Sequence, residues 1–385
     1  MDNEKVIGNK NFLIVLLLCL MFLDWSGYGY YIFYLSFIYF IFKKGFRQID
    51  SNFKLLLLFG LSYSIIDILN VGSISYAYNI LPIINFPMVY LMGKMIADDN
   101  TYNNQISTIW IFAIAMALLT MLSTYVSFLE DGFALVGRDI KLIGYSNRSG
   151  DVLYSATGLY SKILPLTLFT SFLFISEDRK IRWLYFASAI LAFVCCLRLQ
   201  SRSAIYVTTI AIVIPFLFGG KGNLVNKIIG AAVIFCVISY VLSHFSDDLM
   251  IIDRFQNNNA FDNEGQDSRM DLSVKTLQDL LTHPFGGLKM NRYAHNLWID
   301  CARVSGWIPA SILIVITLKW IKTTIQIYRY KKIDYYYRLF IFVASTCLFM
   351  YFNTEPIIEG AAMLFTFFCL YLGMINKTLK KNKLR

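Results

Sequence analysis

Long apolar blocks constrain this chain more than any other feature of its sequence. Residues 11–25, 53–69, 106–128 and 183–199 form runs of this kind, and a helix needs about 20 apolar residues to cross a bilayer core about 30 Å thick. Charged residues make up only 16% of the chain, whereas a soluble domain carries about 25%. The sequence therefore predicts an all-α polytopic integral membrane protein. It excludes a soluble multidomain enzyme, a disordered chain and a disulfide-stapled secreted module.

Polar breaks divide the chain into about twelve predicted transmembrane helices, which form a single transmembrane domain over residues 1–385. The predicted spans are 11–25, 28–42, 53–69, 75–96, 106–127, 153–176, 183–199, 204–218, 228–244, 297–318, 339–353 and 361–376. Two larger loops remain, at about 128–152 and 245–296. Because the polar start Met1–Lys10 leads into a long apolar run, we interpret this run as a first transmembrane helix and not as a cleaved signal peptide.

The positions of the basic residues predict the orientation. Of the 35 lysines and arginines, 23 fall in the termini and in alternate connections between the spans. Cytoplasmic loops of membrane proteins carry this excess, so we expect both termini in the cytoplasm and both larger loops outside. The net charge of +10 is then a sign of orientation and not of nucleic-acid binding. The predicted location is a membrane that the chain crosses many times.

Twelve basic residues lie on the side that the positive-inside bias disfavours: nine are within or beside the two outer loops, Lys162 is inside a span, and Arg198 and Arg202 are at the end of another span. They are Arg138, Lys141, Arg148, Lys162, Arg198, Arg202, Arg254, Arg269, Lys275, Lys289, Arg292 and Arg303. Cations kept near the outer membrane surface favour an anionic ligand there, and a phosphate-bearing lipid headgroup fits that position. The alternative is that they are solvated loop charges that balance the acids between Asp247 and Asp267.

The longer outer loop is predicted to contain an amphipathic helix. Ser268 with Asp271 three residues later resembles a capping box, and Met270, Val274, Leu277 and Leu281 share one helical face. That face is expected to lie against the membrane or the helix bundle. The segment His283–Gly287 ends the helix in a turn. Arg269 falls in the first turn of the helix, where backbone amides favour anions.

Two further positions suggest chemistry. His295 precedes the next span directly, at the predicted membrane surface, and a histidine is able to accept a proton from a hydroxyl at neutral pH. Arg198 and Arg202 are four residues apart at the end of a span, and a fixed guanidinium grips phosphate oxygens in a bidentate manner. Either arginine could instead extend its charge to the interface, and His295 could be an ordinary interfacial side chain.

The sequence gives no sign of a metal or a nucleotide cofactor. The seven cysteines lack the paired spacing of a zinc site, and the acids at 262–267 lack the spacing of a calcium loop. Neither a GxxxxGK[ST] nor a GxGxxG motif occurs. We therefore expect a chemistry that needs no cofactor.

Three segments, in this order, resemble the bacterial O-antigen polymerases and O-antigen ligases, which are membrane glycosyltransferases. The first is Ser201-Arg202-Ser203 between two spans, and the second is Asp267-Ser268-Arg269 followed by His283–Gly287. The third is Ala294-His295-Asn296 followed by Gly306. The resemblance covers roughly residues 195–310. The chain departs from the family at His283, where asparagine is usual, and at Leu288, where a second glycine is frequent.

The resemblance implies a polymerase of undecaprenyl-pyrophosphate-linked oligosaccharide repeats, for O-antigen or capsule, that inverts the sugar linkage at the outer face of the bacterial inner membrane. It implies His295 as the catalytic residue and Arg202 and Arg269 as ligands of the pyrophosphate, with Arg198, Arg254 and Arg292 as further candidates. Arg254 begins an Arg-x10-Gly pattern that ends at Gly265, as in some polymerases. The implied partners are a lipid-linked donor and acceptor, membrane lipid, a chain-length regulator and a flippase.

Other functions stay open at this point. A ligase would differ only in its acceptor, the lipid A core. A flippase or other transporter would place ionisable groups in the middle of its spans, and the candidates for such groups are few (Asp67, Lys162 and Glu355). A structural or assembly protein of the membrane is the remaining alternative.

Overall fold

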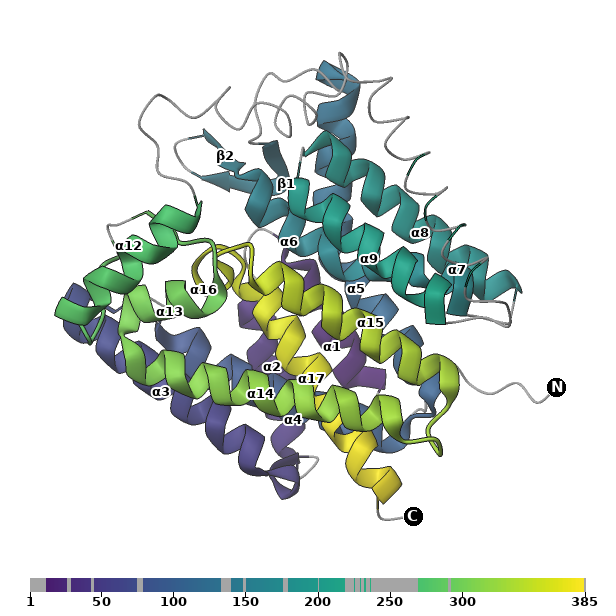
Figure 1. Ribbon diagram of the computed structural model, residues 1–385, viewed down its shortest axis with the longest axis horizontal. Helices are drawn as coiled ribbons and strands as arrows, with labels where there is room; N and C mark the ends of the chain where they lie inside the picture. Colours follow the sequence, from purple (N-terminus) through teal and green to yellow (C-terminus); the bar gives the residue numbers. More distant parts are fainter. Residues whose placement is uncertain are drawn as a thin grey trace.

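The computed structural model describes residues 12–25, 29–42, 45–74, 79–132, 140–147, 150–175, 179–199, 201–218, 269–289 and 292–383, together with the single positions 225, 229, 232 and 236. The described part is a bundle of helices (Figure 1). Its longer helices are α3 (Ser51–Val71), α4 (Leu81–Asp99), α5 (Tyr102–Asp131), α8 (Arg179–Arg198), α9 (Arg202–Phe218), α14 (Trp307–Arg329), α15 (Tyr335–Phe352) and α17 (Ala362–Lys383). The predicted ninth span, Arg254 and most of the longer outer loop lie outside the described residues.

Six helices of the described part are long and apolar enough to cross a membrane. They are α3, α5, α8, α14, α15 and α17. The shorter helices α1 (Phe12–Leu23) and α9 are also apolar. The protein is therefore a helical, membrane-embedded chain, while the number of about twelve spans stays a prediction.

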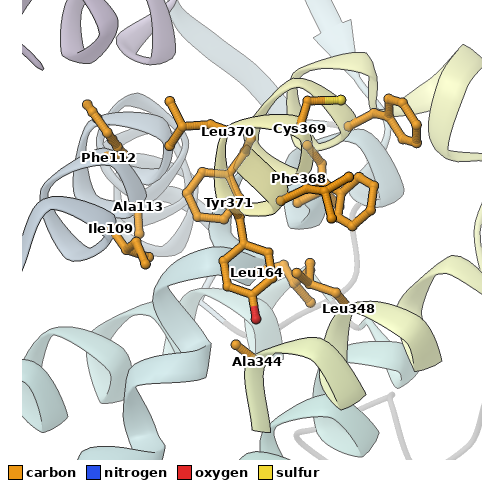
Figure 2. Packing of buried hydrophobic residues seen from close by; sticks show 14 of the residues in the cluster. Ile109, Phe112, Ala113, Leu164, Ala344, Leu348, Phe368, Cys369, Leu370 and Tyr371 are labelled. Atoms are coloured by element: carbon orange, nitrogen blue, oxygen red, sulfur yellow. The ribbon is translucent and has the colours of Figure 1, made fainter. Parts of the chain in front are cut away.

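The centre of the bundle is α17, which is buried over most of its length. Glycines allow it to approach α4 closely: a Cβ at Gly93 would lie 2.1 Å from the Leu370 carbonyl oxygen, and one at Gly373 would lie 2.0 Å from that of Tyr90. Small residues permit such backbone contact between helices in membranes. On its other side, α17 directs Tyr371 between α5, α6 (Ala156–Thr167) and α15 (Figure 2). The Tyr371 hydroxyl is 2.7 Å from Ser345 Oγ.

The two ends of the bundle are chemically different. At one end, lysines join the helices: Lys94 of α4 pairs with Asp50 before α3 at 2.6 Å, and Lys377 of α17 pairs with Asp98 of α4 at 2.9 Å. The Lys94 ammonium and backbone amides hold the pKa of the Asp50 carboxyl below its usual value against the effect of burial. The connections α8–α9, α13–α14 and α15–α16 lie at the opposite end.

The structure departs from the uniform helices expected from hydropathy. Residues 140–154 of the shorter outer loop form an antiparallel hairpin of β1 (Ile140–Asn147) and β2 (Gly150–Tyr154), so the chain is not entirely helical. The predicted span 153–176 consists of α6, a 3-10 turn (η4, Leu168–Ser171) and α7 (Phe172–Ile175). Hydropathy reports how apolar a segment is and does not report its backbone hydrogen bonding.

The predicted span 297–318 is also wrong as a single helix. Gly306 has φ +77° and divides it into α13 (Leu297–Ser305) and α14. The turn 283–288 packs into this break: Gly287 N–H donates to the Val304 carbonyl at 3.1 Å, and Trp307 N–H donates to that of Pro284 at 3.0 Å. The break therefore serves to hold the turn that follows the loop helix.

The predicted loop helix is present as α12 (Arg269–Thr282). The residues predicted to share its apolar face do so, and they are exposed. A different face, with Thr276 and Leu280, is buried towards the bundle. The turn at His283–Gly287 follows as expected, with Gly286 N–H donating to the His283 carbonyl at 2.9 Å.

Candidate functional site

His295 lies in a tightly held connection between α12 and α13. Its backbone has φ +55°, in the left-handed region that is uncommon for residues other than glycine. The Asp300 carboxylate accepts hydrogen bonds from the amides on both sides of it, from Ala294 at 2.8 Å and from Asn296 at 3.0 Å. Asn296 in turn caps α13 through the amides of Trp298 and Ile299. Backbone strain of this kind occurs at functional sites when surrounding contacts maintain it.

The His295 imidazole is paired with Glu355. Nδ1 of His295 lies 3.5 Å from Oε2 of Glu355, which is in the turn between α15 and α16 (Ile357–Gly360). The histidine side chain is 29% exposed and the glutamate side chain 6%, so the imidazole is partly accessible. Nδ1 and Oε2 are buried and lie within ion-pair distance, but they do not meet hydrogen-bond geometry. A carboxylate beside Nδ1 favours the tautomer with a proton there, which leaves Nε2 able to accept a proton.

Glu355 also connects His295 to the Ser201–Ser203 turn. Its second oxygen, Oε1, accepts a hydrogen bond from Ser203 Oγ at 3.3 Å, and Ser203 Oγ lies 3.0 Å from Ser201 Oγ. Arg202, the first residue of α9, is half-buried between these two serines. The structure thus brings the first and the third of the sequence segments together at one carboxylate, although 92 residues of sequence separate Ser203 from His295.

The other predicted residues differ in their surroundings. Arg269 is the first residue of α12, and this helix adjoins the site because Ser273 Oγ donates to the Ala294 carbonyl at 3.2 Å. Arg292 is exposed. Arg198 is 4% exposed and donates to Ser127 Oγ of α5 at 2.9 Å, so its charge is held inside the bundle.

A buried ionic cluster is connected to the site through Asp300. The Arg303 side chain is fully buried and pairs with Asp300 at 3.2 Å and with Glu359. Its guanidinium also donates to the Leu288 and Lys289 carbonyls and lies 4.9 Å from the ring centre of Tyr293. Since Asp300 holds the backbone around His295, this cluster fixes the position of the histidine relative to α13.

The same cluster contains two carboxylates for one guanidinium. Burial raises the pKa of the Glu359 carboxyl to about 7, although the Arg303 guanidinium lowers it and the Asp300 carboxylate raises it further. At neutral pH the second carboxyl is therefore partly protonated. The cluster avoids the cost of burying two full negative charges against one positive charge.

Of the three ionisable residues predicted to lie within spans, one is placed differently. Glu355 is in a turn after α15, not in a helix. Asp67 and Lys162 are within α3 and α6, and each pairs with an opposite charge: Asp67 with Lys289 at 3.3 Å, and Lys162 with Asp24 at 3.1 Å. Sequence reasoning did not connect Glu355 to the site. The available signal was its position just before Pro356 at the predicted outer end of a span.

Comparison with known proteins adds no assignment. No family model matches the chain, and none of the curated proteins matches it. Among the described residues, no group of three or more histidine, cysteine or acidic side chains is arranged to hold a metal ion.

Proposed function

We propose that this protein is a membrane glycosyltransferase that polymerises undecaprenyl-pyrophosphate-linked oligosaccharides at the outer face of the cytoplasmic membrane. The observation that carries the proposal is the link from His295 through Glu355 to the Ser201–Ser203 turn. It connects a proton acceptor to the turn that contains Arg202, at one end of a helical bundle. A base beside an anion-binding cation is what transfer from a lipid pyrophosphate requires.

In the proposed reaction an acceptor hydroxyl oxygen forms a bond to the anomeric carbon of the donor sugar. The anomeric C–O bond to pyrophosphate breaks, and undecaprenyl pyrophosphate leaves with the electron pair, so the configuration inverts. Nε2 of His295 takes the hydroxyl proton, while Glu355 orients the ring. Arg202 and Arg269 neutralise the charge that develops on the pyrophosphate.

The remaining arginines have secondary places in this proposal. Arg292 is exposed in the segment before His295, where it is able to meet the pyrophosphate or the acceptor glycan. Arg254 is assigned from the sequence pattern alone. We assign Arg198 the task of joining α8 to α5 through Ser127, which keeps the end of α8 in place next to Arg202.

Deleting the gene and analysing the surface polysaccharide of the cells tests this function. A polymerase predicts chains reduced to a single repeat on the core. Polymer that forms but stays off the core would indicate a ligase. Loss of lipid-linked repeats at the outer face would indicate a transporter, for which the buried pairs Asp67–Lys289 and Asp24–Lys162 are the relevant observation.

The proposed orientation makes a direct prediction. An exposed cysteine at Gln278→Cys in α12 is expected to react with an impermeant thiol reagent in intact cells, and one at Lys331→Cys between α14 and α15 is expected to react only after lysis. Both variants are made with Cys236→Ser, because Cys236 is exposed. Labelling of position 331 but not of 278 in intact cells would invert the topology and remove the site from the outer face.

The contribution of Arg202 to activity is expected to depend on the planar shape of its guanidinium group as well as on its positive charge. Arg202→Lys keeps the positive charge and loses the planar fork that pairs with two phosphate oxygens, so we expect about 10- to 100-fold slower polymerisation, a loss of about 1.4–2.8 kcal/mol. Arg329→Lys, at the other end of the bundle, is the matched control and should retain full activity. Full activity of Arg202→Lys would make Arg202 an ordinary interfacial cation.

A further inference from the structure

Helix α12 has three distinct faces. One face packs on the bundle, with Leu280 and Thr276 buried at 0% and 4% exposure. A second face is polar and exposed, with Asp271, Lys275 and Gln278. The third face is apolar and exposed: Met270, Val274, Leu277 and Leu281 are 75%, 45%, 38% and 78% exposed. An apolar face exposed to water is unfavourable, whereas it is typical of a helix that contacts lipid.

The turn that follows α12 adjoins the ends of two predicted spans. Asn70, near the end of α3, donates to the Phe285 carbonyl at 2.9 Å, and a Cβ at Gly306 would lie 2.5 Å from Phe285 Cα. Phe285 itself is 61% exposed. It therefore sits between the exposed apolar ends of α3 (Leu69, Val71) and α14 (Trp307, Ile308), directly after α12 in the chain. The apolar surface is continuous from these spans onto the turn that ends α12.

Trp307 indicates where this region lies relative to the headgroup layer of the membrane. It is the first residue of α14, its side chain is exposed, and its indole N–H donates to the Leu280 carbonyl of α12 at 3.2 Å. Tryptophan is enriched where a transmembrane helix meets the headgroup layer. In Figure 1, α12 runs across the end of the bundle where α3 ends and α14 begins. Its depth thus corresponds to the membrane surface.

We propose that α12 is an interfacial membrane helix, with Met270, Val274, Leu277 and Leu281 inserted at the boundary between headgroups and acyl chains of the outer leaflet. Its polar face carries one lysine and two aspartates, so burial of apolar side chains holds it there and attraction to anionic lipids does not. Contact of this apolar face with lipid plays no part in the reaction, so it does not depend on the proposed activity.

The consequence concerns the depth of His295. Ser273 of α12 donates to the Ala294 carbonyl next to His295, and Trp307 and the turn 283–288 tie α12 to the break between α13 and α14. A helix fixed in the interface therefore fixes the height of the histidine above the acyl chains. Any lipid-borne substrate would meet it at headgroup level.

The test uses the full-length protein in vesicles of phosphatidylethanolamine and phosphatidylglycerol. Single spin labels are placed at Met270→Cys, Val274→Cys and Leu281→Cys, and at the matched controls Asp271→Cys, Lys275→Cys and Gln278→Cys on the same helix, all with Cys236→Ser. Oxygen concentrates in the bilayer, whereas a water-soluble nickel complex does not enter it. We expect the ratio of oxygen to nickel accessibility to be several-fold higher for the first set, with a helical period along α12.

Two results would overturn the proposal. Equal nickel access to both sets would place α12 in water. Access of neither reagent to positions 270, 274 and 281 would mean that protein, such as a second copy of the chain, covers the apolar face. Because all six side chains are exposed or half-exposed at a helix surface, the variants are expected to fold.

Discussion

His295→Ala is expected to slow polymer synthesis by about 100- to 10,000-fold, the usual contribution of a general base. Cells carrying this variant should accumulate single-repeat product, since the substitution leaves the proposed pyrophosphate ligands in place. The measurement is the chain length of surface polysaccharide by gel electrophoresis, with the membrane level of each variant determined in parallel. The side chain is at the surface of a well-packed connection, so normal protein levels are expected.

Two further variants make this result specific. His283→Ala changes an exposed histidine at the end of α12, bonded to its neighbour Thr282 at 2.9 Å, and should retain full polymer. Glu355→Gln keeps an oxygen for Ser203 but loses the charge beside His295, so a decrease of about 10- to 100-fold is expected, as for other groups that orient a catalytic histidine. Normal polymer from His295→Ala together with loss in His283→Ala would assign catalysis to the other histidine.

Gly306→Ala is expected to prevent accumulation of the folded protein. At φ +77°, an alanine Cβ would lie 2.3 Å from the Pro284 carbonyl oxygen and 2.5 Å from Phe285 Cα, and both are backbone atoms that cannot turn aside. The left-handed conformation alone costs about 1–2 kcal/mol, and displacement of the packed turn 283–288 is expected to bring the total above about 4 kcal/mol. The measurement is the membrane level of the variant and, for any protein that can be purified, its melting temperature in detergent.

Gly72→Ala separates the two contributions. Gly72 ends α3 at φ +71°, and an alanine Cβ there would have no atom of the described residues within 4 Å. This variant should therefore lose only the conformational part, about 1–2 kcal/mol, and remain folded. If Gly306→Ala were no less stable than Gly72→Ala, the close packing of the turn against the α13–α14 break would not matter for stability.

Hydropathy predicted a helical membrane protein, because a helix that crosses the bilayer needs about 20 apolar residues and six of the described helices meet this condition. The amphipathic helix at Arg269–Thr282 was predicted from its period, and its exposed apolar face was part of that pattern. The break at Gly306 was not predicted, since it depends on hydrogen bonds between residues 283–288 and 303–307. Such bonds form between segments that no local window compares.

The candidate site could also be predicted only in part, because its residues come from segments that are distant in the sequence. The position of His295 at the start of a helix could be predicted from Asn296 as an N-cap and from the polarity of the preceding loop. Its partner Glu355 is 60 residues away in the sequence, and the two meet only because α15 packs beside α9 and α14. The role of Asp300 was also missed, since an acid in the first turn of a helix usually interacts with the helix dipole and here it holds the backbone on both sides of His295.

The three connections that form the candidate site are synthesised at very different times. Ser201–Ser203 follows α8, His295 precedes α13, and Glu355 lies between α15 and α16, close to the last helix. Synthesis proceeds from the N-terminus, so the serine turn and His295 are already made when the ribosome reaches Glu355. The site is completed only when α15 and α17 are inserted. A chain released before that point carries the serine turn and the histidine without the carboxylate that joins them, so the candidate site is absent from it.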